Sequence, residues 1–238
     1  MGLGSLQETI DRIVKSGATD NLAYNIVFQD YVKFHLVFVI GGAVCLLAIS
    51  ILTGFAWWRF IKNVRAQANT ISKFELRTYL LFALVGTLSA LIILMFVIVN
   101  LGTVLAPQEG FELAIADIVA RSGTKTAELH EAVNLWLVSG DGQVPEIVRQ
   151  AVNDRLSWQQ PKMVICGVLF VILSVFATII WSALIKRSRS PKSMTESKWI
   201  LLTLLGILAL PVIFLLLIMT LANAEASFAP ITISLLSG

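Results

Sequence analysis

Residues 34–57 read FHLVFVIGGAVCLLAISILTGFAW, a run without a single Asp, Glu, Lys or Arg. An α-helix needs about 20 predominantly apolar residues to cross the roughly 30 Å hydrocarbon core of a bilayer. Three further uncharged runs of sufficient length follow at residues 79–105, 163–185 and 199–222. The sequence therefore predicts an all-α integral membrane protein with four transmembrane helices.

The composition of the whole chain supports this prediction. Of its 238 residues, 57% are hydrophobic and only 14% are charged, against about 25% charged in an average soluble domain. All 18 basic and 15 acidic residues lie outside the four runs. The first run begins too late and is too long for the apolar part of a cleaved signal peptide, so we predict that it is a retained anchor.

The distribution of charge predicts the orientation in the membrane. Residues 59–78 and 186–198 each hold five basic residues and one acidic residue, whereas residues 1–33 and 106–162 are net acidic. Lys and Arg concentrate in short cytoplasmic loops. We therefore expect both termini and the central loop on the outer face of a plasma or inner membrane. The two basic loops account for the pI near 9.0, so we predict contact with the lipid bilayer and none with nucleic acid.

The chain contains an internal repeat. Several residues of the first half recur 123 or 124 positions later in the same order: Ser50 as Ser174, Trp57 as Trp181, Lys62 as Lys186, and Asn100 as Asn223. We predict two tandem units, residues 1–107 and 108–238, each with an outer amphipathic segment and a helical hairpin around a basic inner loop. Because each unit has two spans, the pseudo-twofold axis should run along the membrane normal, as in parallel repeats.

The segments outside the spans predict short amphipathic helices on the outer face. Apolar residues at positions 6, 10, 13 and 14 follow helical spacing, and the second unit carries further such helices within about 111–158, interrupted at Ser139-Gly140. Such helices lie on a leaflet, cap a bundle or dock a partner. For docking, the sequence offers an apolar set: Leu129, Val133, Trp136, Ile147 and Val148.

Hydroxyl residues mark one face of the third span. Ser174, Thr178 and Ser182 are spaced i, i+4, i+8 and share a face, and Ser50 and Thr53 form a weaker counterpart in the first span. Two interpretations remain open. The face lines a narrow polar path for water or ions, or its small residues allow close helix packing, with the hydroxyls bonded to backbone.

Two further features of the spans have a functional and a plain interpretation. Asn100 and Asn223 occupy matching positions near the outer ends of the second and fourth spans. They could surround an outer mouth or bind an ion, although Asn is common near membrane interfaces. Pro211 lies inside the fourth span, where it could act as a hinge or as a bend that packing accommodates.

The residues that most chemistry requires are missing from the spans. The chain has only two histidines, His35 and His130, and two cysteines, Cys45 and Cys166, at different depths. We find no carboxylate within the four runs, no phosphate-binding loop and no nucleophile motif. The sequence thus predicts no catalytic, cofactor or metal site. We expect a nonenzymatic accessory or scaffold subunit that packs with other membrane subunits, with a homo-oligomeric channel as the alternative.

Overall fold

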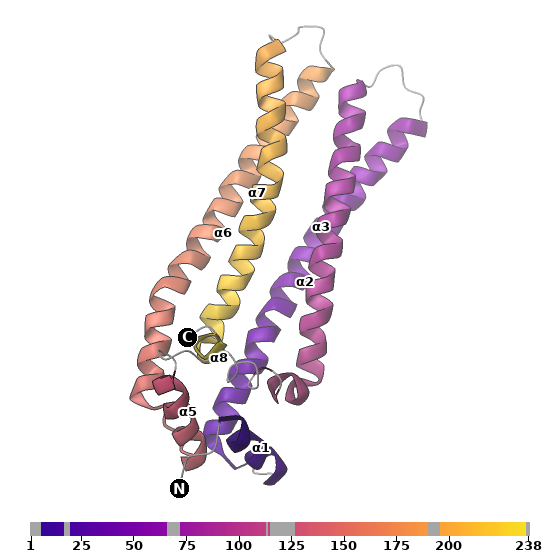
Figure 1. The fold of residues 1–238 in the computed structure, drawn as a ribbon. Helices are drawn as coiled ribbons and strands as arrows, with labels where there is room; N and C mark the ends of the chain where they lie inside the picture. The colour runs from indigo at the N-terminus through magenta and orange to yellow at the C-terminus, as the bar shows by residue number, and fades with distance from the viewer. Residues whose placement is uncertain are drawn as a thin grey trace. The chain divides into compact units, whose positions relative to one another are not determined.

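The computed structural model describes residues 6–16, 20–65, 72–112, 114, 127–189 and 196–236, and all regular secondary structure in these ranges is α-helical. The helices are shown in Figure 1: α1 (Leu6–Ser16), α2 (Leu22–Arg65), α3 (Lys73–Leu105), α5 (Ala127–Ser139), α6 (Glu146–Ser188), α7 (Glu196–Phe228) and α8 (Pro230–Leu236).

Four helices, α2, α3, α6 and α7, are long and apolar enough to cross a membrane. They contain the four uncharged runs of the sequence, and they are the feature expected of an integral membrane protein. At 1.5 Å per residue, the 44 residues of α2 extend about 66 Å, roughly twice the thickness of a hydrocarbon core. A large part of this helix therefore extends beyond any single crossing.

The ends of these helices differ from the ends of the predicted spans. We expected an outer helix ending near residue 158 and a separate span from 163, but α6 is one helix from Glu146 to Ser188 that passes through Pro161. A proline removes one intrahelical hydrogen bond, which bends a helix without always ending it. The stretch without charged residues corresponds to the part that fits the hydrocarbon core. The helix itself continues beyond that stretch. The predicted break after Ser139 is confirmed, because α5 ends there and Gly140 has φ 68°.

The chain divides into two compact units, each with its own core. Unit 1 comprises residues 1–40, 98–163 and 221–238, and unit 2 comprises residues 41–97 and 164–220. Each of the four long helices contributes residues to both units.

The core of unit 1 joins amphipathic segments from both halves of the sequence. Helix α1 packs against α5, and Phe111 meets the rings of Phe28 and Tyr31 edge-on at centroid distances of 5.4 and 5.3 Å. The buried core residues include Leu6, Ile10, Val27, Tyr31, Phe111, Val133, Trp136, Leu137, Val148, Ile231 and Leu235. The apolar faces of these segments are thus buried against one another.

Polar side chains form hydrogen bonds with backbone groups at helix ends in unit 1. Asn21 Oδ1 accepts a hydrogen bond from the Tyr24 amide at 2.8 Å, and its Nδ2 donates to the Leu137 carbonyl at 2.8 Å. Asp30 Oδ2 accepts from both the amide and the hydroxyl of Thr232, at 2.7 and 2.8 Å. Asn21 therefore caps α2, and Asp30 satisfies the first turn of α8.

Unit 2 contains two helical hairpins, α2 beside α3 and α6 beside α7 (Figure 1). Helix α3 also contacts the other hairpin. The Phe82 and Trp181 ring centroids lie 5.1 Å apart, and the Phe74 and Trp199 centroids lie 4.6 Å apart. Ala177, Ile180, Trp181 and Leu184 of α6 form the buried core at this junction.

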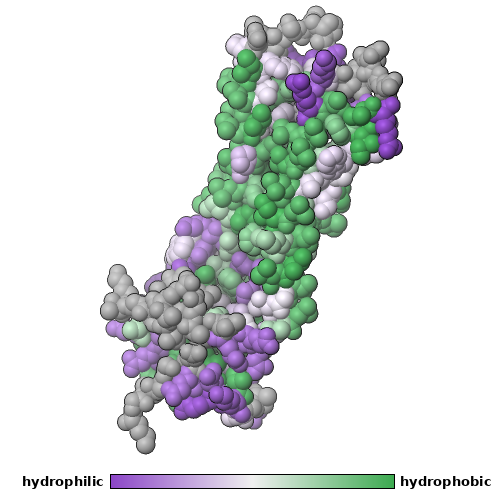
Figure 2. All heavy atoms as spheres, turned by 45° about the vertical axis from the view of Figure 1, so that its right-hand side comes forward, coloured by the Kyte–Doolittle hydropathy of each residue, from purple (hydrophilic) through white to green (hydrophobic). Residues whose placement is uncertain are grey.

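The long helices leave most of their apolar surface uncovered by the chain itself. In the most apolar stretch of each, only 11 to 17% of the residues are buried. Figure 2 shows a broad apolar surface along the helices on the face turned to the viewer. Such a surface requires lipid or other membrane helices as its surroundings.

The same local geometry follows α3 and α7. The chain bends at Ala106 and at Ala229, and in each case helix resumes at the following proline. Each alanine amide donates to the carbonyl four residues earlier, of Gly102 and Glu225 respectively, at 3.0 Å. Proline suits the first position of a helix because it has no N–H to leave unsatisfied. Residues 113 and 115–126, in the first part of the outer segment predicted within about 111–158, lie outside the described residues.

Candidate functional site

A groove between α2 and α3 in unit 2 brings Ser50 and Thr53 together with residues of the second span. Its volume is about 420 Å³. The lining residues are Leu46, Ser50, Thr53, Gly54 and Trp57 of α2 and Thr87, Ala90, Leu91 and Leu94 of α3. The small residues Ser50, Gly54 and Ala90 leave space that forms the groove, and leucines form much of its wall.

Two glycines of the α2–α3 hairpin, Gly86 and the groove residue Gly54, have different surroundings. A methyl group on Gly86 would overlap Thr53 Oγ1, so the absence of a side chain there allows α2 and α3 to approach closely. A methyl group on Gly54 would meet no atom within 4 Å. Gly86 therefore serves the packing within the hairpin, whereas Gly54 faces open space.

Two of the polar side chains in the groove, Trp57 and Thr87, are hydrogen-bonded within the chain. Trp57 Nε1 donates to Thr87 Oγ1 at 3.1 Å, and Thr87 Oγ1 donates to the Ala83 carbonyl at 2.7 Å. These bonds use the indole proton and the threonine proton. The groove therefore presents a largely apolar surface on which the Trp57 indole and the Thr87 hydroxyl are already satisfied.

The hydroxyl residues of α6 do not join this groove, which has no lining residue from α6. Thr178 and Ser182 are exposed, and Ser174 is half-buried. Thr178 Oγ1 donates to the Ser174 carbonyl at 2.7 Å, a bond within its own helix. The packed residues of α6, such as Trp181, lie on a different face. The α6 hydroxyl face is therefore on the surface of the chain.

The two asparagines lie in unit 1 and differ in their surroundings. Asn100 Oδ1 lies 2.7 Å from His35 Nδ1, which is placed to donate to it. The ring of His35 also packs edge-on against Tyr31, with a centroid distance of 4.8 Å. The backbone carbonyl of the half-buried Asn223 accepts a hydrogen bond from Ser227 Oγ at 2.7 Å. The side-chain oxygen of Asn100 is thus engaged with an imidazole.

Pro211 lies on an exposed part of α7, which is continuous from Glu196 to Phe228. The hinge hypothesis stays a prediction, since a single structure contains one state of the helix.

The residues expected to dock a partner are mostly inside the core of unit 1. Val133, Trp136 and Val148 are 1 to 3% exposed, and Leu129 is partly buried against the same core. Their place in the core removes them from the docking surface that we expected, because α1 and α8 cover them from distant parts of the sequence. Ile147 remains exposed, as do Leu135 and Val138 of α5.

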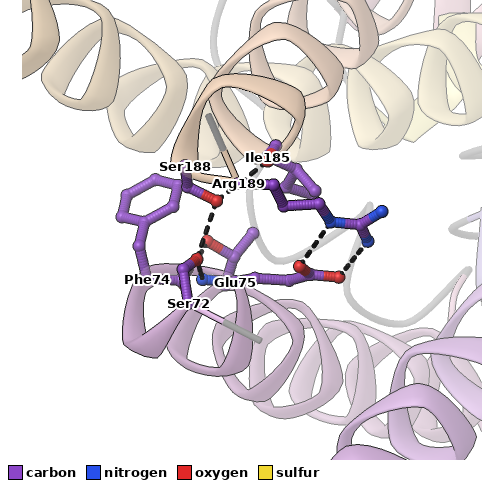
Figure 3. A network of polar contacts seen from close by, with 7 residues as sticks. Ser72, Phe74, Glu75, Ile185, Ser188 and Arg189 are labelled. Atoms are coloured by element: carbon purple, nitrogen blue, oxygen red, sulfur yellow. Dashed lines mark hydrogen bonds and ion pairs between the residues drawn. The ribbon is translucent and has the colours of Figure 1, made fainter. Parts of the chain in front are cut away.

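A polar network at the loop ends of unit 2 was not predicted from the sequence (Figure 3). Glu75, 1% exposed, forms a two-point ion pair with Arg189, with Nε donating to Oε2 at 2.8 Å and the second amino group to Oε1. The carboxylate raises the pKa of Arg189. The Glu75 amide donates to Ser72 Oγ at 3.1 Å, and Ser72 Oγ donates to Ser188 Oγ at 2.7 Å.

This network connects the two halves of the chain, since the partners lie 114 or 116 positions apart. The spacing Ser72-x-x-Glu75 is that of a capping box, and it was the available signal for a helix start. A capping-box glutamate normally bonds back to the N-cap amide. Here its carboxylate pairs with Arg189 instead, which no local pattern predicts.

Sequence reasoning also missed a buried carboxylate at Glu225, which is 8% exposed. It lies three residues beyond the fourth uncharged run, on a helix that continues to Phe228. Within the part of the chain that the structure describes, no group of three or more His, Cys, Asp or Glu side chains could hold a metal ion.

No protein family, characterised protein or solved structure matches this chain. The groove, the exposed hydroxyl face and the polar network are the features on which a function can be based.

Proposed function

We propose that the protein is a nonenzymatic integral membrane scaffold or accessory subunit that binds a helix of another membrane subunit in the α2–α3 groove. The observation that carries this proposal is the groove itself, with small residues Ser50, Gly54 and Ala90 between leucine walls. Helices associate in bilayers largely through small residues that permit close backbone approach. Here such residues lie on the surface, and none of the described helices covers them.

The chemistry of the groove favours a helix over an ion. An ion-conducting path needs oxygen atoms free to replace water. The hydroxyl and indole protons at Thr87 and Trp57 are already donated within the hairpin. Most of the lining residues are apolar, which suits the side chains of a membrane helix.

The proposal includes an orientation and a second contact surface. We place the two basic loops on the cytoplasmic side and both termini on the outer side, as the distribution of charge in the sequence predicts. The matching bends after α3 and α7 support a duplicated hairpin with a parallel pseudo-twofold axis. In unit 1, the exposed Ile147 keeps the docking role that we predicted for it. The exposed Leu135 and Val138 take this role in place of the buried residues of that set.

Photocrosslinking in native membranes tests the groove. A benzoylphenylalanine at Leu91, 57% exposed in the groove wall, is expected to form an adduct with another polypeptide. The matched control is Leu52, which is 70% exposed on α2 but does not line the groove. It should yield lipid adducts alone. Equal protein adducts at both positions, or none at Leu91, would contradict the proposal.

A pair of glycine variants separates binding from folding. A Cβ at Gly54 meets no atom within 4 Å, so Gly54→Leu should fill the groove, abolish the Leu91 adduct and leave thermal stability unchanged. Gly102→Leu is the control, since it also meets no atom within 4 Å and lies outside the groove. It should retain the adduct. Loss of the adduct in both variants would indicate a general disturbance rather than a blocked groove.

The second candidate is a homo-oligomeric pore, and one observation favours it. Thr178 and Ser182 are exposed on α6, so several copies could turn this face toward a common axis. Thr178→Leu should then abolish conductance in planar bilayers while the variant remains folded. Conductance unchanged from that of the natural chain would exclude a path along this face.

A further inference from the structure

The loop end of α2 carries a second hollow in unit 2, with a volume of about 470 Å³. It is lined by Trp58, Ile61, Lys62 and Arg65. These positions are spaced i, i+3, i+4, i+7 and therefore share one face of the helix. Trp58 and Ile61 form the apolar part of this face, and Lys62 and Arg65 form its cationic part.

Two cations lie over an exposed indole: Lys62 of this face and the neighbouring Arg59. Lys62 Nζ lies 5.2 Å and the Arg59 guanidinium 5.4 Å from the Trp58 ring centroid. Trp58 is 53% exposed. Across the described ranges, no carboxylate forms an ion pair with Arg59, Lys62 or Arg65. The positive charge is therefore not neutralised by the part of the protein that the structure describes.

The corresponding face of the second half is different. The residues 124 positions later are Ser182, Ile185, Lys186 and Arg189. Serine replaces the tryptophan, and Arg189 is paired with the buried Glu75. The corresponding face thus keeps the two basic residues, but the Arg189 guanidinium is already paired with Glu75 and no tryptophan belongs to this face. This half supplies a control within the same chain.

We propose that the face of Trp58, Ile61, Lys62 and Arg65 binds the headgroup of an anionic phospholipid. Lys62 and Arg65 bind the phosphate, Trp58 lies at the level of the glycerol, and Ile61 contacts the upper part of an acyl chain. Basic residues next to a transmembrane helix attract anionic lipids, and tryptophan concentrates at the membrane interface. The apolar half of the hollow favours a lipid over a free phosphate ion.

Native mass spectrometry of the full chain tests this site. The protein is ejected from nanodiscs of phosphatidylcholine that contain a minor fraction of phosphatidylglycerol, and the retained lipids are counted. The natural chain should retain phosphatidylglycerol in preference. Lys62→Gln with Arg65→Gln should lower this preference about thirtyfold, on the scale expected for two basic residues near an anionic surface. Lys186→Gln with Arg187→Gln, the same charge change in the second loop, should leave it unchanged.

Two further measurements keep the outcome specific. Trp58→Leu, at an exposed position, should reduce the preference without changing the thermal stability of the protein. Excess inorganic phosphate should not displace the retained lipid. Equal losses in the two double variants would overturn the proposal and indicate non-specific attraction. Displacement by inorganic phosphate alone would overturn the lipid assignment.

Discussion

The ion pair between Glu75 and Arg189 makes an asymmetric prediction for the two single variants. The side chain of Glu75 is 2% exposed, whereas that of Arg189 is 55% exposed. Arg189→Met leaves a buried carboxylate without its ionic partner, a loss of about 3 kcal/mol, the low end for buried pairs because Arg189 is half in solvent. Glu75→Gln leaves a guanidinium that can turn to water, which costs only about 1 kcal/mol.

These values convert into separable thermal shifts. For a chain of this size, 1 kcal/mol corresponds to about 2–4 °C in Tm. Arg189→Met should thus lower Tm by about 6–12 °C, and Glu75→Gln by about 2–4 °C. The double variant should cost little more than Glu75→Gln alone, because no carboxylate remains to lose its partner.

The assay is thermal unfolding in mild detergent followed by circular dichroism. Arg187→Met is the control, since Arg187 is exposed in the same turn and should not change Tm. Equal shifts for the two single variants, or a double variant equal to their sum, would refute the reasoning that the buried carboxylate depends on Arg189.

Three other predictions follow from unit 1 and from the α2–α3 hairpin. Gly86→Ala should destabilise the natural chain by about 1–3 kcal/mol through overlap with Thr53 Oγ1, but not a Thr53→Ala background, as shown by Tm in a double-mutant cycle. Asp30→Ala removes the acceptor of two hydrogen bonds from Thr232 and should lower the free energy of unfolding by about 2 kcal/mol. Proteolysis at α8 should become faster, and an unchanged rate would contradict the capping role of Asp30. Burial lowers the pKa of His130 below its ordinary value of 6.5, so the unfolded chain takes up the proton first and stability falls as pH drops below about 6.5. His130→Gln should remove that part of the pH dependence of Tm. A pH profile identical to that of the natural chain would exclude this role of His130.

The spans were predictable because the membrane acts on a local property of the sequence. A run of about 20 apolar residues without charge forms a helix that could cross a membrane, and this follows from the run itself. The helix ends were not predictable in this way, because α2 and α6 continue through charged residues and, in α6, through Pro161. Backbone hydrogen bonding does not stop where the hydrocarbon stops.

Only those features of the candidate site that depend on a single helix were predicted from the sequence. Helical spacing showed that Val133 and Trp136 share an apolar face, but not that α1 and α8 would cover them. The hydroxyl row of α6 was visible in the sequence, whereas the groove beside Ser50 needs α3 as its second wall. The pair of Glu75 and Arg189 spans 114 positions. Such contacts depend on tertiary packing, which local patterns do not contain.

The mass of the particle extracted from native membranes tests the central claim most directly. The protomer is 26.1 kDa, and the account predicts additional membrane polypeptides of different sequence in a fixed ratio, lost in Gly54→Leu and retained in Gly102→Leu. A particle that contains only the 26.1 kDa chain, whether one copy or several, would contradict the scaffold account, and a closed ring of copies would favour the pore.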